Sequence, residues 1–414
     1  MSRIDKPRRS VTHLLRVFLP FALGYFISYL FRNVNAVIAP DLVRDLSLDP
    51  GSLGLLSSVY LLSFGAFQLP LGLLLDRYGP RRVEAGLLLL AALGAYLFSS
   101  AESLSGLVVA RALIGLGVSA CLMAAFKAFV IWFPRERLPL ANGIQMVSGG
   151  MGALAATTPV ELALRFTDWR GVFAAVSVLT LIAAAGIFLV VPEKAGAERQ
   201  ESFSDQWAGV TEVLKSRFFW RLAPWAFCAQ AAYLSIFGLW SGPWLRDVAG
   251  YTRGEVARTL SGLALATIVG YLLSGSLADR LSRRGISPLK VATTGMTLFA
   301  LVQGGMLFVS GLLVVPFWIL FGLCGASCIL PYAVLSQHFP AELSGRANTA
   351  LNLLVFFAAF AAQWGIGTII GLWPETAVGG YAVAGYRTSF LAVLVVQVLA
   401  AGWFMFSKWL TRSR

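Results

Sequence analysis

Apolar stretches of about twenty residues recur along the whole sequence, and no other feature constrains the fold as strongly. Three clear examples are 84–101, 172–192 and 388–407. As a helix, a stretch of this length crosses the roughly 30 Å hydrocarbon core of a bilayer. Only helices and closed barrels satisfy all their backbone polar groups in lipid, and no alternating pattern indicates a barrel. The sequence therefore predicts an all-α membrane protein.

Twelve such helices account for the chain. Only 13% of the 414 residues are charged and 57% are hydrophobic, whereas about a quarter of the residues in soluble domains are charged. An even number of crossings places both termini on the same side of the membrane. The expected spans are 14–38, 52–75, 84–101, 104–132, 139–162, 169–191, 222–245, 256–278, 288–313, 315–337, 347–372 and 386–407.

The net charge of +13 sets the orientation of the chain rather than a nucleic-acid surface. Most of the 33 Lys and Arg residues fall in the termini and in the loops on their side of the membrane. By the positive-inside rule, this bias places both termini in the cytoplasm. The basic start, MSRIDKPRRS, leads into a long apolar run without a small-residue cleavage site, which we interpret as the first membrane helix. We expect an integral protein of a bacterial inner (plasma) membrane that contacts lipid and binds no nucleic acid.

Motifs for enzyme chemistry are missing from the sequence. It contains no G-x-x-x-x-G-K phosphate loop and no H-E-x-x-H zinc motif. All four cysteines fall in predicted spans, and no His or Met accompanies the closely spaced Cys324 and Cys328 to indicate a metal site. We predict a monomeric protein that is not an enzyme and needs no metal or cofactor.

The sequence divides into two halves that carry similar loop motifs in the same order. The polar segment 192–217 is a predicted cytoplasmic linker between residues 1–191 and 218–414, each of which holds six expected helices. GLLLDRYGPRR at 72–82 corresponds to GSLADRLSRRG at 275–285, and WFPRERLPLAN corresponds to HFPAELSGRAN in the same order. Parallel repeats of this kind are typical of transporters in which two bundles rock about a site near the midplane.

With these motifs the chain resembles the major facilitator superfamily over essentially its whole length. The loop signature of that family, G-x-L-x-D-R-x-G-R-R, is matched by Gly72, Leu74, Asp76, Arg77, Gly79 and Arg81. The second copy is weaker, since Ser282 replaces its second glycine, and RALIGLG at 111–117 resembles the R-x-x-x-G-x-G stretch of helix four. The resemblance implies twelve helices in two pseudo-symmetric six-helix bundles that work by alternating access.

The resemblance also implies a conformational latch at the first of these loops. Gly79 permits a sharp turn and Pro80 makes it rigid. Asp76 can pair with an arginine or with the positive end of a helix from the other half. The alternative is that the arginines only hold the topology, and Pro80 stands where the family has an arginine. The predicted latch residues are Gly72, Asp76, Arg77, Gly79, Arg81, Arg111, Asp279 and Arg280.

Arg32 is the leading candidate for substrate binding, because ionisable groups within a bilayer are costly and usually functional. At 100° per residue it shares one arc of the first helix with Tyr25, Tyr29 and Asn35. Its planar guanidinium can bind a carboxylate or phosphate with two hydrogen bonds. The alternative is a structural arginine that pairs with a neighbouring helix.

Three further ionisable residues fall within the expected spans. Arg111 is expected to pack against the first helix, near Arg32. Lys127 either approaches the substrate, and then also serves in coupling, or extends to the inner interface. Glu161, taken as the only carboxylate inside a span, either neutralises one of the two arginines or carries the coupling proton.

The second half is expected to supply a polar and aromatic wall for the same cavity. Such side chains bind a ring and also offer a hydrogen-bonding group. For Trp240 and Trp244, an interfacial aromatic belt is the alternative. The predicted lining residues are Gln230, Tyr233, Phe237, Trp240, Tyr332, Asn348 and Asn352.

These features favour a secondary transporter that takes up a small anionic or zwitterionic organic solute, with a proton as the coupling ion. The alternative is a proton-coupled multidrug efflux antiporter. Efflux members of the family carry a Gly-Pro pair on helix five, where this chain reads SGGMGALAATTP, and the sugar-porter signature P-E-S-P-R is replaced by PEKAG. Both absences count against those subclasses and leave the identity of the substrate open.

Overall fold

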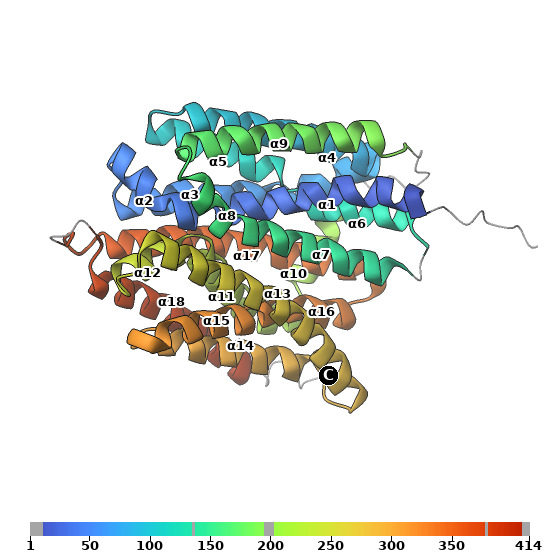
Figure 1. Ribbon diagram of the computed structural model, residues 1–414. Coiled ribbons are helices and arrows are strands. Elements are labelled where there is room, and N and C mark those ends of the chain that lie inside the picture. Colours follow the sequence, from blue (N-terminus) through green and yellow to red (C-terminus); the bar gives the residue numbers. More distant parts are fainter. Residues whose placement is uncertain (1–10, 135–136, 194–202, 377–379, 408–414) are drawn as a thin grey trace, which may run out of the picture.

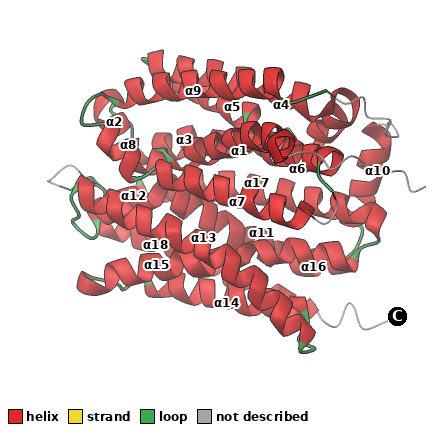
Figure 2. Cartoon of the chain, turned by 45° about the vertical axis from the view of Figure 1, so that its right-hand side comes forward, coloured by secondary structure: helices red, strands yellow, loops and turns green. Residues whose placement is uncertain are grey.

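A computed structural model describes residues 11–134, 137–193, 203–376 and 380–407. Every secondary-structure element within these residues is a helix. Figure 2 shows long helices joined by short loops, which confirms the all-α prediction. Residues 194–202, in the predicted linker, lie outside the described part of the chain.

In the first half of the chain, breaks interrupt the long membrane segments. Long apolar helices therefore alternate with shorter helices that begin at a proline or a polar residue. The elements are α1 (Val11–Asn33), α2 (Asn35–Leu46), α3 (Pro50–Ala66), α4 (Gln68–Ser100), α5 (Leu104–Gly117), α6 (Cys121–Trp132), α7 (Leu138–Ala155), α8 (Thr158–Ala163) and α9 (Trp169–Val190).

The second half repeats this plan after a short helix in the predicted linker. A π-helical turn and two 3-10 turns interrupt its long segments. The elements are α10 (Phe203–Leu214), α11 (Arg217–Ser235), η2 (Ile236–Trp240), α12 (Ser241–Asp247), α13 (Arg253–Arg283), α14 (Pro288–Gly305), η3 (Gly311–Leu313), α15 (Val314–Gly325), η4 (Ala326–Ile329), α16 (Leu330–His338), α17 (Ala341–Ile370) and α18 (Val383–Phe406).

Helix α4 contains the turn that the sequence predicts at Gly79. This glycine has φ 77° and ψ 161°, a conformation that side-chain-bearing residues avoid, and Pro80 begins the next helical segment. The turn divides α4 into the end of one expected span, 52–75, and the whole of the next, 84–101. Helix α4 therefore belongs to two membrane crossings, one on each side of Gly79.

Nine described helical segments are long and apolar enough to cross a membrane, and α3 is a shorter apolar helix. Helices α7 and α8 cover most of the expected span 139–162, and α14 covers most of 288–313, but neither span is among these nine segments. The nine segments are Leu15–Asn33, Gln68–Ser100, Leu104–Trp132, Trp169–Val190, Arg217–Asp247, Arg253–Arg283, Gly311–His338, Leu343–Ile370 and Val383–Phe406.

The helices form two bundles that lie against each other. In Figure 1, α1 to α9 occupy the upper part and α11 to α18 the lower part, and α3 of the first bundle runs along α17 of the second. We call the side where α1 begins and α18 ends the terminal side. The opposite side, where α2 and α12 lie, is the far side.

Candidate functional site

A cavity of about 700 Å³ lies between the two bundles. Its walls come from α1, α3 and α6 on one side and from α11, α16 and α17 on the other. The lining extends to Arg346, to the exposed Gly345 and to Val210 of the linker helix α10. The cavity therefore reaches the surface on the terminal side.

Arg32 projects into this cavity through a cage of aromatic rings. Its guanidinium carbon lies 4.7 Å from the ring centre of Tyr29, 5.1 Å from Phe64 and 5.5 Å from Phe356. Among the described residues, no carboxylate forms an ion pair with it, and its buried Nε has no hydrogen-bond partner. Ring faces attract the cation without occupying its N–H groups. The site thus presents a partly desolvated cation whose Nε is available to a ligand.

The other predicted residues of this arc, on α1 and at the start of α2, divide between the cavity and the protein interior. Tyr25 lines the cavity, donates its hydroxyl to Met146 Sδ at 3.6 Å, and has its ring centre 5.0 Å from that of Tyr29. Asn35 is buried outside the cavity, and its side-chain amide donates to Ser57 Oγ at 2.6 Å. Three of the four residues on the arc that the helical period defines therefore line the cavity, whereas Asn35 packs against α3 of its own bundle.

The second bundle supplies amide and hydroxyl groups to the cavity. The Tyr332 hydroxyl donates to Asn352 Oδ1 at 3.0 Å, and the Asn348 amide donates to Ser336 Oγ at 2.8 Å. The buried carbonyl oxygens of Gln230 and Asn348 have no hydrogen-bond partner in the described part of the chain. Those oxygens can accept hydrogen bonds from a hydroxyl-bearing solute.

Three other predicted residues of this bundle lie beside the main cavity. Tyr233 and Phe237 line a side pocket of about 30 Å³ that also contacts Arg32. Trp240 is fully buried, and its indole donates to the Gln363 carbonyl at 2.9 Å. It lines neither space and is not part of an interfacial belt.

Sequence reasoning missed several residues of the site. Phe64 and Tyr271 line the cavity, and Phe64 forms the ring cage together with Tyr29 and Phe356. Each lies in an expected span and has no distinguishing motif. Arg346 also lines the cavity and differs from them in being a charged residue next to HFPAELSG. Its charge near the start of an expected span was a usable signal.

The predicted latch residues are held mainly within their own bundles. Lys127 Nζ donates to Asp76 Oδ1, which joins α6 to α4 in the first bundle. Lys127 itself is not among the cavity-lining residues. Gly72 lines the cavity. Arg77 lies over the ring of Tyr78, with 5.3 Å between the guanidinium carbon and the ring centre.

The remaining basic and acidic groups of the two loops also find local partners. Arg81 donates to the Phe188 carbonyl at 2.8 Å and to Glu193 at 3.4 Å. In the second loop, Asp279 accepts from Arg283 on the same helix at 2.7 Å. Arg280 is exposed.

Arg111 is enclosed in the first bundle. Its Nη1 donates to the Phe31 carbonyl of α1 at 2.9 Å. Its guanidinium carbon lies within 6 Å of the ring centres of Tyr60, Phe98 and Phe173. This residue therefore packs α5 against α1 and does not reach the cavity.

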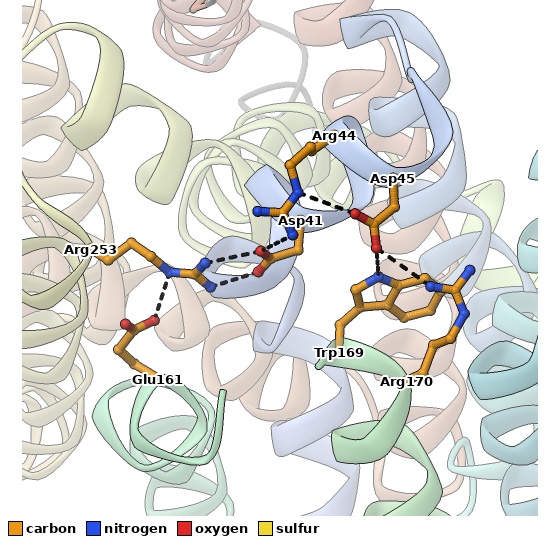
Figure 3. A network of polar contacts seen from close by, with 7 residues as sticks. All are labelled: Asp41, Arg44, Asp45, Glu161, Trp169, Arg170 and Arg253. Carbon is orange, nitrogen blue, oxygen red and sulfur yellow. Dashed lines mark hydrogen bonds and ion pairs between the residues drawn. The ribbon is translucent and has the colours of Figure 1, made fainter. Parts of the chain in front are cut away.

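On the far side, a network of charges joins the two bundles. Arg253, at the start of α13, donates to both carboxylate oxygens of Asp41, at 2.9 and 2.6 Å. Its Nε donates to Glu161 at 3.1 Å. Figure 3 shows the guanidinium held between these two carboxylates. Glu161 is thus paired with an arginine of the other bundle rather than with Arg32 or Arg111.

The network continues along α2 to a second carboxylate. Asp45 accepts a hydrogen bond from the Trp169 indole at 2.9 Å and contacts Arg170 at 3.5 Å (Figure 3). The indole hydrogen bond, aided by Arg44, holds the pKa of Asp45 below its ordinary value. These bonds fasten α2 to α9 within the first bundle.

Uncharged contacts close the far side further. Ser261 of α13 forms hydrogen bonds with Thr157 at 2.8 Å and Thr158 at 2.7 Å. A Cβ on Gly242 would overlap the carbonyl of Ala36, so α12 and α2 touch through their backbones. The bundles are therefore in contact on the far side and separated by the cavity on the terminal side.

Two helical bundles around a central cavity, joined at one end and parted at the other, define a solute carrier. The chain belongs to the Major Facilitator Superfamily, whose sequence model matches residues 21–363. Membership of this family makes the protein a transporter rather than an enzyme, and it confirms the predicted family and fold.

Proteins similar to this chain include several named transporters. The hexuronate transporter of Escherichia coli K12 is 26% identical over 404 residues, which cover 92% of this chain and 90% of that protein. A probable sulfoacetate transporter of Cupriavidus necator is 26% identical over 302 residues, 70% of each chain. The galacturonate transporter of Dickeya chrysanthemi is 26% identical over 269 residues, 61% of this chain and 78% of the other.

Solved structures share the fold at low sequence identity. A bacterial homologue of the human lysosomal transporter Spinster, inward-facing and occupied, matches with a TM-score of 0.78 and 18% identity, covering 96% of this chain and 97% of the other. A D-xylose–proton symporter matches with a TM-score of 0.75 and 14% identity, covering 95% and 97%.

Proposed function

We propose that this protein is a secondary active transporter that takes up a small organic anion and binds its acid group at Arg32. The observation that carries the proposal is the environment of Arg32, a cation in a cavity of about 700 Å³ that is ringed by aromatic side chains instead of carboxylates. Burial of a charge without an ion-pair partner is costly. The same desolvation strengthens the attraction between Arg32 and an incoming carboxylate or sulfonate.

The names of the relatives agree with an acidic substrate. Hexuronate, galacturonate and sulfoacetate all carry an acid group that is ionised at neutral pH. Hydroxyl groups of such a solute can meet the amides and hydroxyls of α11, α16 and α17, where Gln230 of α11 and Asn348 of α17 have oxygens without a partner among the described residues. Since the named relatives transport acids, the multidrug efflux alternative gains no support from them.

The transport cycle that we propose is alternating access between the two bundles. If the basic terminal side faces the cytoplasm of a bacterium, as the positive-inside rule favours, the cavity opens inward. The far-side network of Arg253, Asp41 and Glu161 then closes the extracellular path in this state. In this proposal residues 1–191 and 218–414 rock about the linker 192–217, and the network breaks when the outside opens.

The loop between the two halves of α4 acts in the proposed cycle as part of the cytoplasmic latch. Here Asp76 is bound to Lys127 of its own bundle, as expected for a state in which the cytoplasmic side is open. We propose a proton as the coupling ion. Since both Glu161 and Lys127 are engaged in ion pairs, neither is our choice for the proton site.

Uptake into proteoliposomes tests this function. Radiolabelled galacturonate and sulfoacetate serve as probes, and galactose is the neutral control. The proposal predicts uptake of at least one acid and not of galactose, with loss of that uptake in Arg32→Gln. Transport of galactose at the same rate as the acids, or unimpaired acid uptake in Arg32→Gln, would refute it.

A further inference from the structure

Glu84 is a buried carboxyl group that none of the contacts above explains. It lies on α4, five residues after the Gly79 turn, and its side chain is fully buried. Within the described residues, neither of its two carboxyl oxygens has a hydrogen-bond partner. Among the described buried acids it is the only one with both oxygens unpaired, since Asp41 and Glu161 share Arg253.

Helices α1 and α6 enclose this carboxyl group from two sides. A Cβ on Gly24 of α1 would overlap Glu84 Oε1, so the glycine makes room for the acid. On the other side, the Cys121 thiol of α6 is the titratable group that lies close enough to interact with the Glu84 carboxyl group. Tyr25, next to Gly24, directs its hydroxyl to Met146 instead.

Charged groups near this stretch of α4 are bound elsewhere. Arg81, one turn earlier, contacts Phe188 and Glu193. Lys127 of α6 is bound to Asp76. From α9, the polar group that faces α4 is Ser177, which donates to the Ala92 carbonyl, and α5 presents the backbone of Gly117. In the described part of the chain, Glu84 therefore has no cation within ion-pair distance.

An ionised carboxylate in such surroundings would lose its hydration without compensation. The group is therefore held as the neutral acid in this state. A neutral acid becomes a carboxylate only when water or a cation reaches it. Movement of α1 relative to α4 and α6 would supply that access, because these are the helices that exclude water.

We propose that Glu84 is the proton-binding site that couples the pH gradient to transport, an inference that rests on the proposed proton-coupled uptake. Helix α1 connects it to the substrate site. Gly24 and Arg32 are eight residues apart, about 12 Å along the helix. Between them the ring of Tyr25 packs on Tyr29, whose ring covers Arg32.

The proton balance of the cycle is simple. The Glu84 carboxylate takes up a proton from water that is continuous with the outside, and the resulting acid is enclosed as α1 closes against α4 and α6. When α1 shifts after substrate release, the O–H bond breaks, the proton passes to cytoplasmic water, and the carboxylate is restored. Binding of an anion to Arg32 and of a proton to Glu84 gives no net charge for a monovalent substrate carried with one proton.

Infrared spectroscopy of the purified protein tests protonation without any substrate. At neutral pH the wild type should show the carbonyl stretch of a buried, protonated carboxylic acid. Glu84→Gln should lose this band and Glu84→Asp should keep it. The exposed Glu102 supplies the matched control, because Glu102→Gln should leave the band unchanged. A band that persists in Glu84→Gln overturns the proposal.

Flux measurements with radiolabelled galacturonate and sulfoacetate then test coupling. With one proton per substrate, a gradient of one pH unit accumulates a probe at most about tenfold. Wild type and Glu102→Gln should approach this value, whereas Glu84→Gln should show exchange at equal pH but no accumulation. Accumulation in Glu84→Gln that equals wild type overturns the role of Glu84.

The wild type separates this inference from the function on which it rests. If wild-type protein transports neither probe, the proposed function fails. If it exchanges a probe but does not respond to the pH gradient, Arg32 keeps its role and proton coupling at Glu84 is refuted. If it accumulates a probe and the Gln variant does too, only Glu84 is wrongly assigned.

Discussion

The two ends of the cavity use charge in opposite ways. On the far side, Arg253 of the second bundle binds Asp41 and Glu161 of the first. On the terminal side, Asp76 binds Lys127 within a single bundle. Ion pairs that cross between bundles hold them together, whereas pairs within a bundle leave them free to separate. The comparison shows that the number of charges at an end does not tell whether that end is closed. What tells it is whether the ion pairs there join the two bundles or lie within one bundle.

Of the changes at the two ends of the cavity, removal of the arginine that crosses the far side should have the largest effect. Asp41 and Glu161 are nearly buried and the Arg253 side chain is 42% exposed, so the loss lies between that of a surface pair and that of a buried one, about 2 kcal/mol. Arg253→Ala should shift the equilibrium toward the far-side-open form by about 30-fold. Reaction of a cysteine introduced at Thr157, which is buried against Ser261 of the other bundle, with a membrane-impermeant thiol reagent measures this opening. Arg258→Ala, an exposed arginine one turn further along α13, is the control.

If the thiol reagent reacts equally with Arg253→Ala and the control, the network does not close the far side. Glu161→Gln should give a smaller shift than Arg253→Ala, because the bidentate bond to Asp41 remains. The same reagent measures it.

The two loop aspartates give an effect of intermediate size. Asp76 is 30% exposed and its partner Lys127 is 18% exposed, whereas Asp279 and Arg283 are both more than half exposed. Asp76→Asn should therefore lower the rate of uptake about tenfold, and Asp279→Asn less than about twofold. Uptake rates, normalised to the amount of protein in the membrane, test the comparison. Equal rates for the two variants would remove the latch role from Asp76.

A small effect on stability should come from the hydrogen bond between the Trp169 indole and the Asp45 carboxylate, beside the far-side network. Trp169→Phe keeps the ring and removes the hydrogen bond that lowers the pKa of Asp45, at a cost of about 1 kcal/mol. A carboxyl group with a depressed pKa contributes stability above its unfolded pKa and loses it as the pH falls through the folded pKa. Thermal unfolding in detergent should therefore show a deficit for Trp169→Phe at pH 7 that shrinks below about pH 4. A deficit independent of pH would assign the loss to packing alone.

Periodicity along single helices predicted more than contacts between helices. The helical period placed Arg32, Tyr25 and Tyr29 on one face, and all three line the cavity. The turn at Gly79 followed from glycine and proline chemistry, which is also local. Both features depend on residues close together in the sequence.

Partners on other helices could not be predicted in this way. Glu161 meets Arg253 only because α8 and α13 are neighbours in space, 92 residues apart in sequence. Glu84 was missed because it stands at the first residue of an expected span, where a carboxylate suggests a solvated helix end. The continuation of α4 past Gly79, against α1 and α6, buries it instead.

The central claim is that Arg32 binds the acid group of the substrate. Isothermal titration calorimetry of the purified protein with galacturonate and sulfoacetate measures this binding most directly. The bidentate geometry of arginine predicts that Arg32→Lys weakens binding of the favoured acid and that Arg32→Gln weakens it about 100-fold, or about 3 kcal/mol. Arg32→Gln protein that remains folded and binds the acid as tightly as the wild type would contradict the account.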